Sequence, residues 1–313
     1  MPAYDRKSLV RAVVVGVVLI GLFVFFFITP AHDPKPNGLP VAVVGQSSSV
    51  DGLVSSLESR DFDVERVATP AEARQRIDDR DVYGAFVQQP GPPRLLVASA
   101  ASVPAAELLE GIAEEAGITQ VIDVNPTDPD DPRGVTINLL VLALVITSIL
   151  TALVAVQMLP GLRALGPRAA SAGAAAVIGG LVALGIVKAE GALPGPLIPE
   201  LAVIALAIFA VALCSAGIIR LIGPAGMGAP FLLFLMLGNP ASGQASAPEL
   251  LPTPWYPLGL FMPPGALGDG LRGVAYFDGA GVLLPVIVLV AWAALGVALN
   301  QLASRRADAR PAA

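Results

Sequence analysis

The sequence predicts a polytopic α-helical membrane protein with six transmembrane helices and an extracytoplasmic α/β domain inserted between helices 1 and 2. Three observations lead to this fold class. Hydrophobic residues form 55% of the 313 residues and charged residues only 14%, a balance that favours a membrane protein. The apolar residues are gathered in long blocks, one near the start and the others in the second half. Residues 30–134 separate the first block from the rest, and their pattern alternates between strand and helix.

Each apolar block is long enough to cross a bilayer. A helix rises about 1.5 Å per residue and the hydrocarbon core is about 30 Å thick, so about 20 apolar residues are sufficient. The predicted spans are residues 10–28, 135–158, 169–187, 201–219, 221–237 and 282–299. We interpret the first as an uncleaved anchor, because it is longer than the apolar part of a signal peptide and no small-x-small cleavage site follows it.

Basic residues predict the orientation, since short cytoplasmic segments carry the excess of Lys and Arg. With six spans, both termini and two inner turns fall on one side of the membrane. That side holds only Asp5 and Asp308 as acidic residues. Its basic residues are Arg6, Lys7, Arg11, Arg163, Arg168, Arg220, Arg305, Arg306 and Arg310. We therefore predict a multi-pass protein of the cell membrane with both termini in the cytoplasm.

The charges divide unevenly between the predicted parts of the chain. These parts are the cytoplasmic N-terminus with the first helix (1–29), the extracytoplasmic domain with its linker (30–134), the five-helix transmembrane domain (135–301) and the cytoplasmic tail (302–313). Residues 30–134 hold 18 acidic and 8 basic residues, which leaves 7 acidic and 11 basic residues elsewhere. A basic nucleic-acid footprint is absent, so we expect a lipid bilayer and no nucleic acid among the partners.

Within residues 30–134 the hydrophobic period alternates between strand and helix, which predicts a small α/β sandwich. Thr69 is the predicted N-cap of the second helix, with Pro70 in its first turn, and Gly117 ends the third helix. The one cysteine, Cys214, lies in the fourth predicted span, so a packed core rather than a disulfide must stabilise this domain. The predicted strands are 39–45, 62–67, 82–87, 94–98 and 120–124, and the predicted helices are 50–60, 70–78 and 104–116.

The loop before the last span, residues 239–281, is unusual. Its seven prolines are too many for one continuous helix, and it is too apolar for a loop in free water. Irregular backbone at membrane depth is tolerated where protein or a water-filled cavity satisfies its polar groups. We expect a re-entrant or interfacial pair of short helices that lines an outer vestibule; the alternative is a loop packed on the acidic domain. The candidate vestibule residues are Asn239, Pro240, Trp255, Tyr256 and Arg272.

The sequence contains no complete motif for catalysis or for cofactor binding. Residues 268–273 match G-x-G-x-x-G, but no strand precedes them and no acidic residue follows at the required distance. Residues 123–128 resemble the start of a calcium loop without its turn glycine and closing Glu, so we interpret them as a solvated acidic linker. His32 is the only histidine, which excludes a His-based triad or a multi-histidine metal site. Without a Walker motif, we expect no enzyme activity and no cofactor in this chain.

Polar residues within or beside the spans are candidates for a substrate pathway, because ionisable groups in a bilayer usually face the protein interior. Polar residues in spans also have other roles. Amides and hydroxyls form hydrogen bonds between helices, and charged residues at the ends of spans extend toward the interface. The small residues Ala172, Ala176 and Gly180 indicate close helix packing, within the monomer or across a dimer. The candidate pathway residues are Asn138, Gln157, Lys188, Glu190 and Glu200, with the milder Thr147, Ser148 and Thr151.

The order of these parts resembles that of type-2 ABC exporter permeases and of the related phage-infection-protein family. Both have a single span, an outer α/β domain and then clustered spans. The outer domain contains Tyr83-Gly84-Ala85-Phe86-Val87. The loop before the last span is similar to the outer loop of those permeases in Gly238-Asn239-Pro240-Ala241-Ser242-Gly243, Leu251-Pro252, Pro263-Pro264-Gly265 and Leu271-Arg272. The resemblance covers nearly the whole chain and names no substrate.

The resemblance implies two kinds of function. The first is the permease subunit of an ABC-type exporter, a homodimer with a separate cytoplasmic ATPase that exports a lipid-like, drug-like or polymeric substrate. Arg163 and Arg168 are then candidates for docking the ATPase, although the same residues could serve only to orient the protein. The inner turn, residues 159–168, leaves room for a short coupling helix at most. The second is a non-transporting cell-surface scaffold or secretion accessory that binds a partner through the acidic outer domain.

Overall fold

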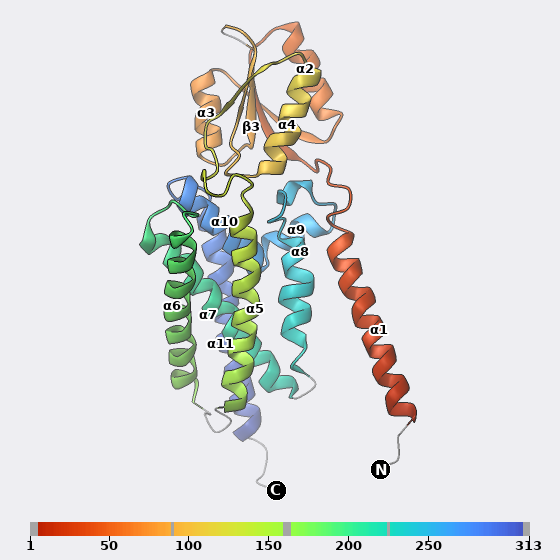
Figure 1. The fold of residues 1–313 in the computed structure, drawn as a ribbon, viewed down its shortest axis with the longest axis vertical. Coiled ribbons are helices and arrows are strands. Elements are labelled where there is room, and N and C mark those ends of the chain that lie inside the picture. Colours follow the sequence, from red (N-terminus) through yellow and green to blue (C-terminus); the bar gives the residue numbers. More distant parts are fainter. Residues whose placement is uncertain (1–5, 89–90, 159–163, 224–225, 309–313) are drawn as a thin grey trace.

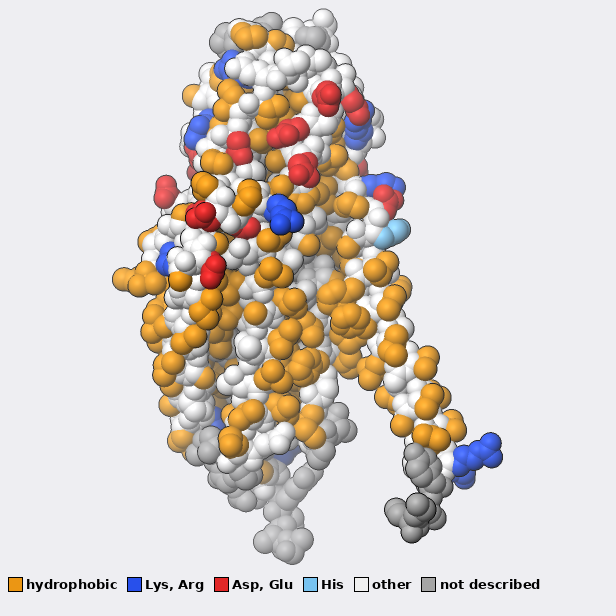
Figure 2. Space-filling view, viewed as in Figure 1, with side chains coloured by type: hydrophobic (Ala, Val, Ile, Leu, Met, Phe, Trp, Pro, Cys, Tyr) orange, Lys and Arg blue, Asp and Glu red, His pale blue; other side chains and the backbone are white. Residues whose placement is uncertain are grey.

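The computed structural model describes residues 6–88, 91–158, 164–223 and 226–308. An α/β unit, residues 39–123, lies at one end of the long axis, and the long helices extend away from it (Figure 1). Hydrophobic side chains cover the helices on the face drawn in Figure 2, whereas acidic side chains gather on the α/β unit and at its junction with the helices. The long helices therefore present the kind of surface that a bilayer covers.

Five strands of the α/β unit form one mixed sheet of order β2-β1-β3-β4-β5. β1 pairs in parallel with β2 and β3, β3 and β4 are antiparallel, and β5 is parallel to β4. All five predicted strands are confirmed, with small shifts at their ends. They are β1 (Leu39–Val44), β2 (Phe62–Val67), β3 (Gly84–Val87), β4 (Arg94–Val97) and β5 (Gln120–Asp123).

Three helices cover the two faces of this sheet. α2 (Ser48–Glu58) and α4 (Val103–Glu115) pack on one face, and α3 (Pro70–Asp78) packs on the other. The Thr69 hydroxyl accepts a 3.1 Å hydrogen bond from Glu72 N, which confirms the predicted N-cap. Both faces are covered by buried apolar side chains, so the alternation of apolar residues in the sequence supplies the core.

Five helices among the described residues are long and apolar enough to span a membrane, and they correspond to five of the six predicted spans. α7 lies at the centre of the bundle, with α5, α6 and α11 packed against it. No residue of α1 is buried, and α1 joins the rest near its end, where Phe26 meets Trp255 edge to face at 5.5 Å between ring centroids. The five are α1 (Arg6–Ile28), α5 (Val135–Met158), α6 (Leu165–Ala189), α7 (Leu197–Ile222) and α11 (Leu283–Asp308).

The predicted span at residues 221–237 differs from the structure. α7 continues to Ile222 and ends at Gly223, which has a φ of 82°, a conformation that favours glycine. The next helical segment contains the π-helix η2 (Phe231–Gly238) and α8 (Asn239–Ala241). Its apolar part, Phe231–Ala241, is about 16 Å long at about 1.5 Å per residue, which is half a bilayer core. Figure 1 shows that it returns the chain toward the α/β unit.

Glycines set the closest approaches between the long helices. A Cβ on Gly217 of α7 would lie 2.6 Å from the Cβ of Leu299, and one on Gly296 of α11 would lie 2.7 Å from Cys214 N. On α6, a Cβ on Gly180 would lie 3.1 Å from Leu201 Cδ1. Gly180 of the small-residue pattern thus packs against α7 within one chain.

The predicted linker is less solvated than expected. Asp131 is only 6% exposed, and its carboxylate accepts hydrogen bonds from Val135 N at 3.0 Å and Thr136 N at 2.9 Å. It therefore satisfies the first backbone amides of α5. Nearby, Asn125 Nδ2 donates to Asp78 Oδ1 at 3.0 Å, which ties the linker to α3. Within residues 123–128, the stretch interpreted as solvated, Asp123 is exposed and Asn125 and Asp128 are partly exposed, so the buried carboxylate lies just beyond that stretch.

Candidate functional site

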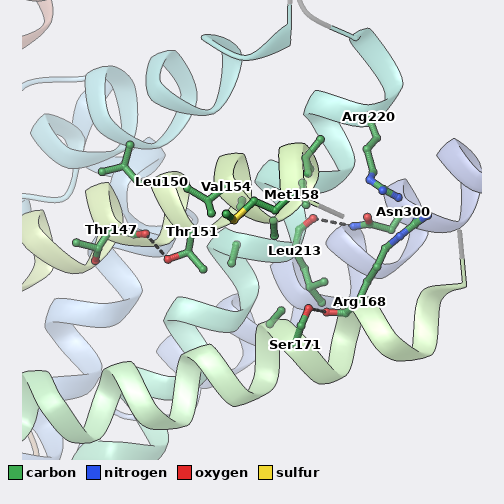
Figure 3. A pocket seen from close by; sticks show the side chains of 16 residues that line it. Thr147, Leu150, Thr151, Val154, Met158, Arg168, Ser171, Leu213, Arg220 and Asn300 are labelled. Carbon is green, nitrogen blue, oxygen red and sulfur yellow. Dashed lines mark hydrogen bonds between the residues drawn. The ribbon is translucent and has the colours of Figure 1, made fainter. Parts of the chain in front are cut away.

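A pocket of about 620 Å³ lies among the long helices (Figure 3), near the ends of α5 and α7 that lie far from the α/β unit (Figure 1). We call it the inner pocket. Its lining comes from residues 147–158 of α5, 168–172 of α6, 212–220 of α7 and Asn300 of α11. α5 and α6 both pack against α7 but scarcely contact each other, so the pocket lies in the space that their separation leaves.

The wall that α5 contributes to the inner pocket is apolar. Leu150, Val154 and Met158 are 43%, 53% and 76% exposed. The hydroxyls of Thr147 and Thr151 donate to carbonyls of their own helix, Ala143 O and Thr147 O, each at 2.7 Å. These hydroxyls have protein acceptors, so the α5 wall suits a hydrocarbon occupant.

The inner end of the pocket is basic. Figure 3 shows the side chains of Arg168 and Arg220 directed toward Asn300 from two different helices. Arg168 Nη1 donates to Ser304 Oγ at 3.1 Å, and Ser304 Oγ donates to Asn300 O at 3.0 Å. No Asp or Glu occurs among the described residues that line the pocket. The pocket thus combines an apolar wall with two cationic groups.

Asn300 is held rigidly at this end. It is fully buried, and its Nδ2 donates to Leu213 O at 2.8 Å and to Gly296 O at 2.9 Å. Its Oδ1 is buried and has no hydrogen-bond partner among the described residues. A buried acceptor without a partner is unfavourable, so this oxygen suits a donor on a bound molecule.

A second polar region joins the outer loop to the α/β unit. The loop contains η3 (Pro248–Leu250), α9 (Trp255–Leu260) and α10 (Pro263–Tyr276). α9 and α10 correspond to the predicted pair of short helices. On α10, Arg272 is only 6% exposed. Its Nη1 contacts Gln244 Oε1 and its Nη2 donates to Gln244 O at 3.0 Å, while Asp269 Oδ1 lies 3.9 Å away. Arg272 is therefore an internal tie of the loop.

The outer loop also packs directly on the α/β unit, as the alternative interpretation expected. Arg80 Nη1 donates to Asp269 O at 2.9 Å, and Ser102 Oγ donates to Ser246 O at 2.6 Å. Leu250 joins the core on one face of the sheet, and Phe277 joins the core on the other face. The loop thus holds the sheet from both sides.

One partly buried acid lies in this contact. Tyr83 Oη donates to Glu249 Oε2 at 2.7 Å. Burial raises the pKa of Glu249 above its ordinary value, and the hydrogen bond from Tyr83 opposes part of that shift. Burial also raises the pKa of Tyr83 well above its ordinary value, with the Glu249 charge as the next cause. Tyr83 therefore stays a neutral hydrogen-bond donor at physiological pH.

The five candidate vestibule residues do not line one cavity in the described structure. Trp255 packs with Phe26 beside an apolar pocket of about 530 Å³. Arg272 instead lines a polar pocket of about 280 Å³ together with Asn138 of α5. Asn239 and Pro240 form the start of α8, and Tyr256 lies half-buried on α9. The structure thus places Asn138 with Arg272, a proximity that the sequence did not indicate.

The candidate pathway residues also occupy separate places. Lys188 Nζ lies 2.8 Å from Glu200 Oε2 and donates to Gly195 O at 2.7 Å. Glu200 is fully buried, so this pair closes the turn between α6 and α7. Glu190 and Gln157 are exposed. The described structure therefore contains no continuous row of these five side chains.

Of the two candidate coupling residues, Arg163 lies outside the described residues and Arg168 lines the inner pocket. From the sequence, Arg220 is predicted only as an orientation residue, and the last predicted span ends one residue before Asn300. An arginine and an asparagine at the ends of apolar spans are the signals that could have drawn attention to them. Their proximity comes only from the packing of α7 against α11.

The G-x-G-x-x-G match lies within α10, where its glycines serve packing. A Cβ on Gly268 would collide with the side chain of Gln244, and one on Gly273 would lie 2.5 Å from Val282 Cγ2.

No group of His, Cys, Asp and Glu suited to a metal ion occurs in the described parts of the chain. Comparison with known proteins finds no matching family model, curated protein or solved structure.

Proposed function

We propose that this chain is the membrane-spanning permease subunit of an ABC-type exporter, that a separate cytoplasmic ATPase energises it, and that its substrate is lipid-like. The observation that carries the proposal is the inner pocket, an apolar cavity of about 620 Å³ among the long helices with Arg168 and Arg220 at its end. A volume of about 300–1,000 Å³ is typical of ligand pockets. A protein that only displays an outer domain has no need of such a cavity between its spans.

The proposed topology has six crossings. The fifth is made by residues 226–241, in which the short helix Phe231–Ala241 covers only part of the bilayer thickness. The support for this topology is the distribution of charge. The end of the bundle far from the α/β unit holds the start of α1 and α6 and the ends of α5, α7 and α11 (Figure 1). The positive-inside rule puts this basic end in the cytoplasm and the α/β unit outside. Described basic residues at this end are Arg6, Lys7, Arg11, Arg168, Arg220, Arg305 and Arg306.

The proposed assembly is a homodimer. α1 is apolar on all sides and has no buried residue, and beside it an apolar cavity of about 450 Å³ is lined by Phe23 of α1 and Phe231 of η2. A helix with so little contact in its own chain is suited to contact with a second copy. The ATPase would contact the inner turn, with Arg163 as the candidate, because Arg168 already contributes to the inner pocket.

One observation favours the alternative, a non-transporting scaffold. Strand β5 is an edge of the sheet, and its Val121 and Ile122 are 40% and 38% exposed. An exposed apolar edge strand is a place where another chain can add a strand. In this function the α/β unit would bind a partner through β5, and the rigid contact with the outer loop would hold that unit in place.

The test is whether a filled inner pocket abolishes function. The tagged chain is purified from its native membranes in mild detergent, and ATP hydrolysis is measured with and without added membrane lipid. Ala172→Phe places a ring in the pocket, whereas Ala170→Phe places it on the exposed surface of the same helix. We expect lipid-stimulated hydrolysis in the unchanged protein and in Ala170→Phe, and its loss in Ala172→Phe. A preparation without any associated ATPase activity favours the scaffold.

A further inference from the structure

The two edges of the sheet in the α/β unit differ in their side chains. The strand order places β2 at one edge and β5 at the other. On β2, Glu65 Oε1 lies 2.8 Å from Arg76 Nη2 of α3, and Arg66 Nη2 lies 2.8 Å from Asp51 Oδ1 of α2. Charged side chains on an edge strand oppose pairing with another chain. All four residues of β5 are exposed, and only Asp123 among them is charged, so β5 is much less protected.

The backbone of β5 has hydrogen-bonding groups that the sheet does not use. Val124 N, just after β5, donates to Val97 O of β4 at 2.8 Å. Successive residues of a strand direct their backbone groups to opposite sides, so Ile122 also faces β4, whereas Val121 and Asp123 face away from the sheet. Among the described residues, the backbone N–H and C=O groups of these two have no hydrogen-bond partner. An added strand would find donors and acceptors there.

Helix α4 makes one side of this edge acidic. Three exposed glutamates of α4 are spaced i, i+3 and i+7, so they share one side of the helix. A fourth, Glu115, lies on another side and forms an ion pair at 2.7 Å with Arg60, just after α2. Because α2 packs on β2 and α4 packs on β4, the shared side lies away from α2 and toward β5. The three glutamates are Glu107, Glu110 and Glu114.

The two faces of the sheet would offer different surroundings to an added strand. Val121 is aligned with Leu95, which lies in the core beneath α4, and Ile122 is aligned with Leu96, which lies in the core beneath α3. Side chains of a strand alternate between the two faces. Every second side chain of an added strand would therefore lie on the acidic α4 face, and the others would lie beside Ile122, which is 38% exposed.

We propose that β5 binds, by strand addition, an extended segment of another protein in which basic and apolar residues alternate. The basic residues lie on the α4 face. The apolar residues lie on the α3 face, where Arg74 already donates to Val124 O at 3.1 Å and would repel a second base. A second copy of this chain is a poor occupant, because pairing of two β5 strands would bring the glutamates of both α4 helices together. The inference goes beyond the proposed exporter and does not depend on transport.

Binding of a designed peptide tests the proposal. The full chain is reconstituted in nanodiscs of phosphatidylcholine, and its affinity for a fluorescent octapeptide of alternating Lys and Val is measured. Empty nanodiscs report binding to lipid alone. Two other peptides give the comparison. One alternates Glu and Val, and the other has the Lys–Val sequence with methylated peptide nitrogens, which cannot donate hydrogen bonds.

Two pairs of variants separate the backbone from the charges. Val121→Pro removes an N–H that faces away from β4, a position where a strand tolerates proline, whereas Val121→Thr keeps this N–H in a residue of similar shape. Glu110→Gln with Glu114→Gln removes two charges beside β5. Glu58→Gln with Asp63→Asn removes two exposed charges near β2 and is the matched control. Melting temperatures check that each variant is folded.

We expect the unchanged protein to bind the Lys–Val peptide and to bind the other two peptides at least about tenfold more weakly. Val121→Pro should weaken binding about fivefold, the net contribution of one hydrogen bond, and the Glu110 and Glu114 variant about threefold. Val121→Thr and the β2 control should bind as the unchanged protein does.

Three results would overturn the proposal. The first is equal affinity for the Lys–Val peptide and its methylated form, and the second is equal affinity for the Lys–Val and Glu–Val peptides. The third is dissociation of a dimer of this chain by Val121→Pro, which would assign β5 to a second copy. If Val121→Pro fails to fold, the peptide comparison and the glutamate variant still decide.

The outcomes also separate this inference from the proposed function. If the Lys–Val peptide binds as expected but no ATPase activity accompanies the chain, the partner site on β5 stands and the exporter function fails. If lipid-stimulated ATP hydrolysis is found and the peptide does not bind, the exporter function stands and the partner site is wrong.

Discussion

Tyr83 of the α/β unit donates a 2.7 Å hydrogen bond to Glu249 of the outer loop. This contact joins parts of the chain that are 166 residues apart, at a junction that also includes Arg80 and Asp269. The α/β unit is therefore attached to the loop before the last span as well as through its own chain connections. A movement of that loop should be transmitted to the unit, and the contact can be tested by substitution.

Tyr83→Phe removes the donor and leaves the carboxylate of Glu249 partly buried without it. We expect a loss of about 0.5–1.5 kcal/mol in the free energy of unfolding, the net contribution of one hydrogen bond, because Tyr256 also contacts this carboxylate. Thermal unfolding in detergent measures this loss. Ser56→Ala, at an exposed position of α2, is the control and should leave stability unchanged. Equal stability of Tyr83→Phe and the unchanged protein contradicts the importance of this hydrogen bond.

The same contact predicts a dependence on pH. Burial raises the pKa of Glu249 in the folded protein above its unfolded value, so the folded state binds a proton more tightly. The resulting stabilisation is complete below the unfolded pKa, about 4.3 for a glutamate, and is lost as the pH rises through the raised pKa. Glu249→Gln should remove this term. The melting temperatures of the two proteins from pH 4 to 8 should diverge, with the unchanged protein losing stability relative to the variant; parallel curves would contradict this.

The glycines of α10 should be required for packing. Gly268→Ala places a methyl group against the side chain of Gln244, and overpacking of this kind costs about 1–3 kcal/mol. Gly185→Ala on α6 meets no atom within 4 Å and should be neutral or slightly stabilising, because alanine favours a helix. Melting temperatures of the two variants give the comparison. The prediction fails if both substitutions have the same effect.

The pair formed by Lys188 and Glu200 should be structural. Lys188→Met leaves the fully buried carboxylate of Glu200 without its partner, which costs about 3–5 kcal/mol for a buried ion pair. Replacing both residues by Met should restore most of the lost stability, because no uncompensated charge remains. Unfolding of the single and double variants tests this. A double variant as unstable as the single one would show that the pair itself is required.

The proposed topology can be tested with an impermeant thiol reagent on intact cells. In a Cys214→Ala background, Ser56→Cys on the exposed surface of α2 should be labelled, and Ala307→Cys near the end of α11 should not. Disruption of the cells should make Ala307→Cys reactive, which controls for its accessibility. Labelling of Ala307→Cys in intact cells would place the C-terminal end of α11 outside and exclude the six-crossing topology.

Hydropathy located most of the long helices, and its error at residues 221–237 has a local cause. An average over a window counts apolar residues and is insensitive to backbone conformation. Gly223 adopts a φ of 82° and ends α7 inside the predicted span, and the apolar helix that follows starts only at Phe231. Glycines and prolines between these points, among them Pro224 and Pro230, are residues that interrupt helices.

The local elements of this protein follow from neighbouring residues, because a helix cap, a strand alternation or an apolar block depends on residues close in the chain. Thr69 caps α3, and residues 135–158 form α5 for such local reasons. Which distant residues share a site depends instead on how the helices pack. Arg168, Arg220 and Asn300 come together because α6, α7 and α11 pack side by side, with Gly180, Gly217 and Gly296 permitting the close approach. Likewise, Tyr83 reaches Glu249 because the outer loop packs on the sheet, a long-range contact that no local pattern encodes.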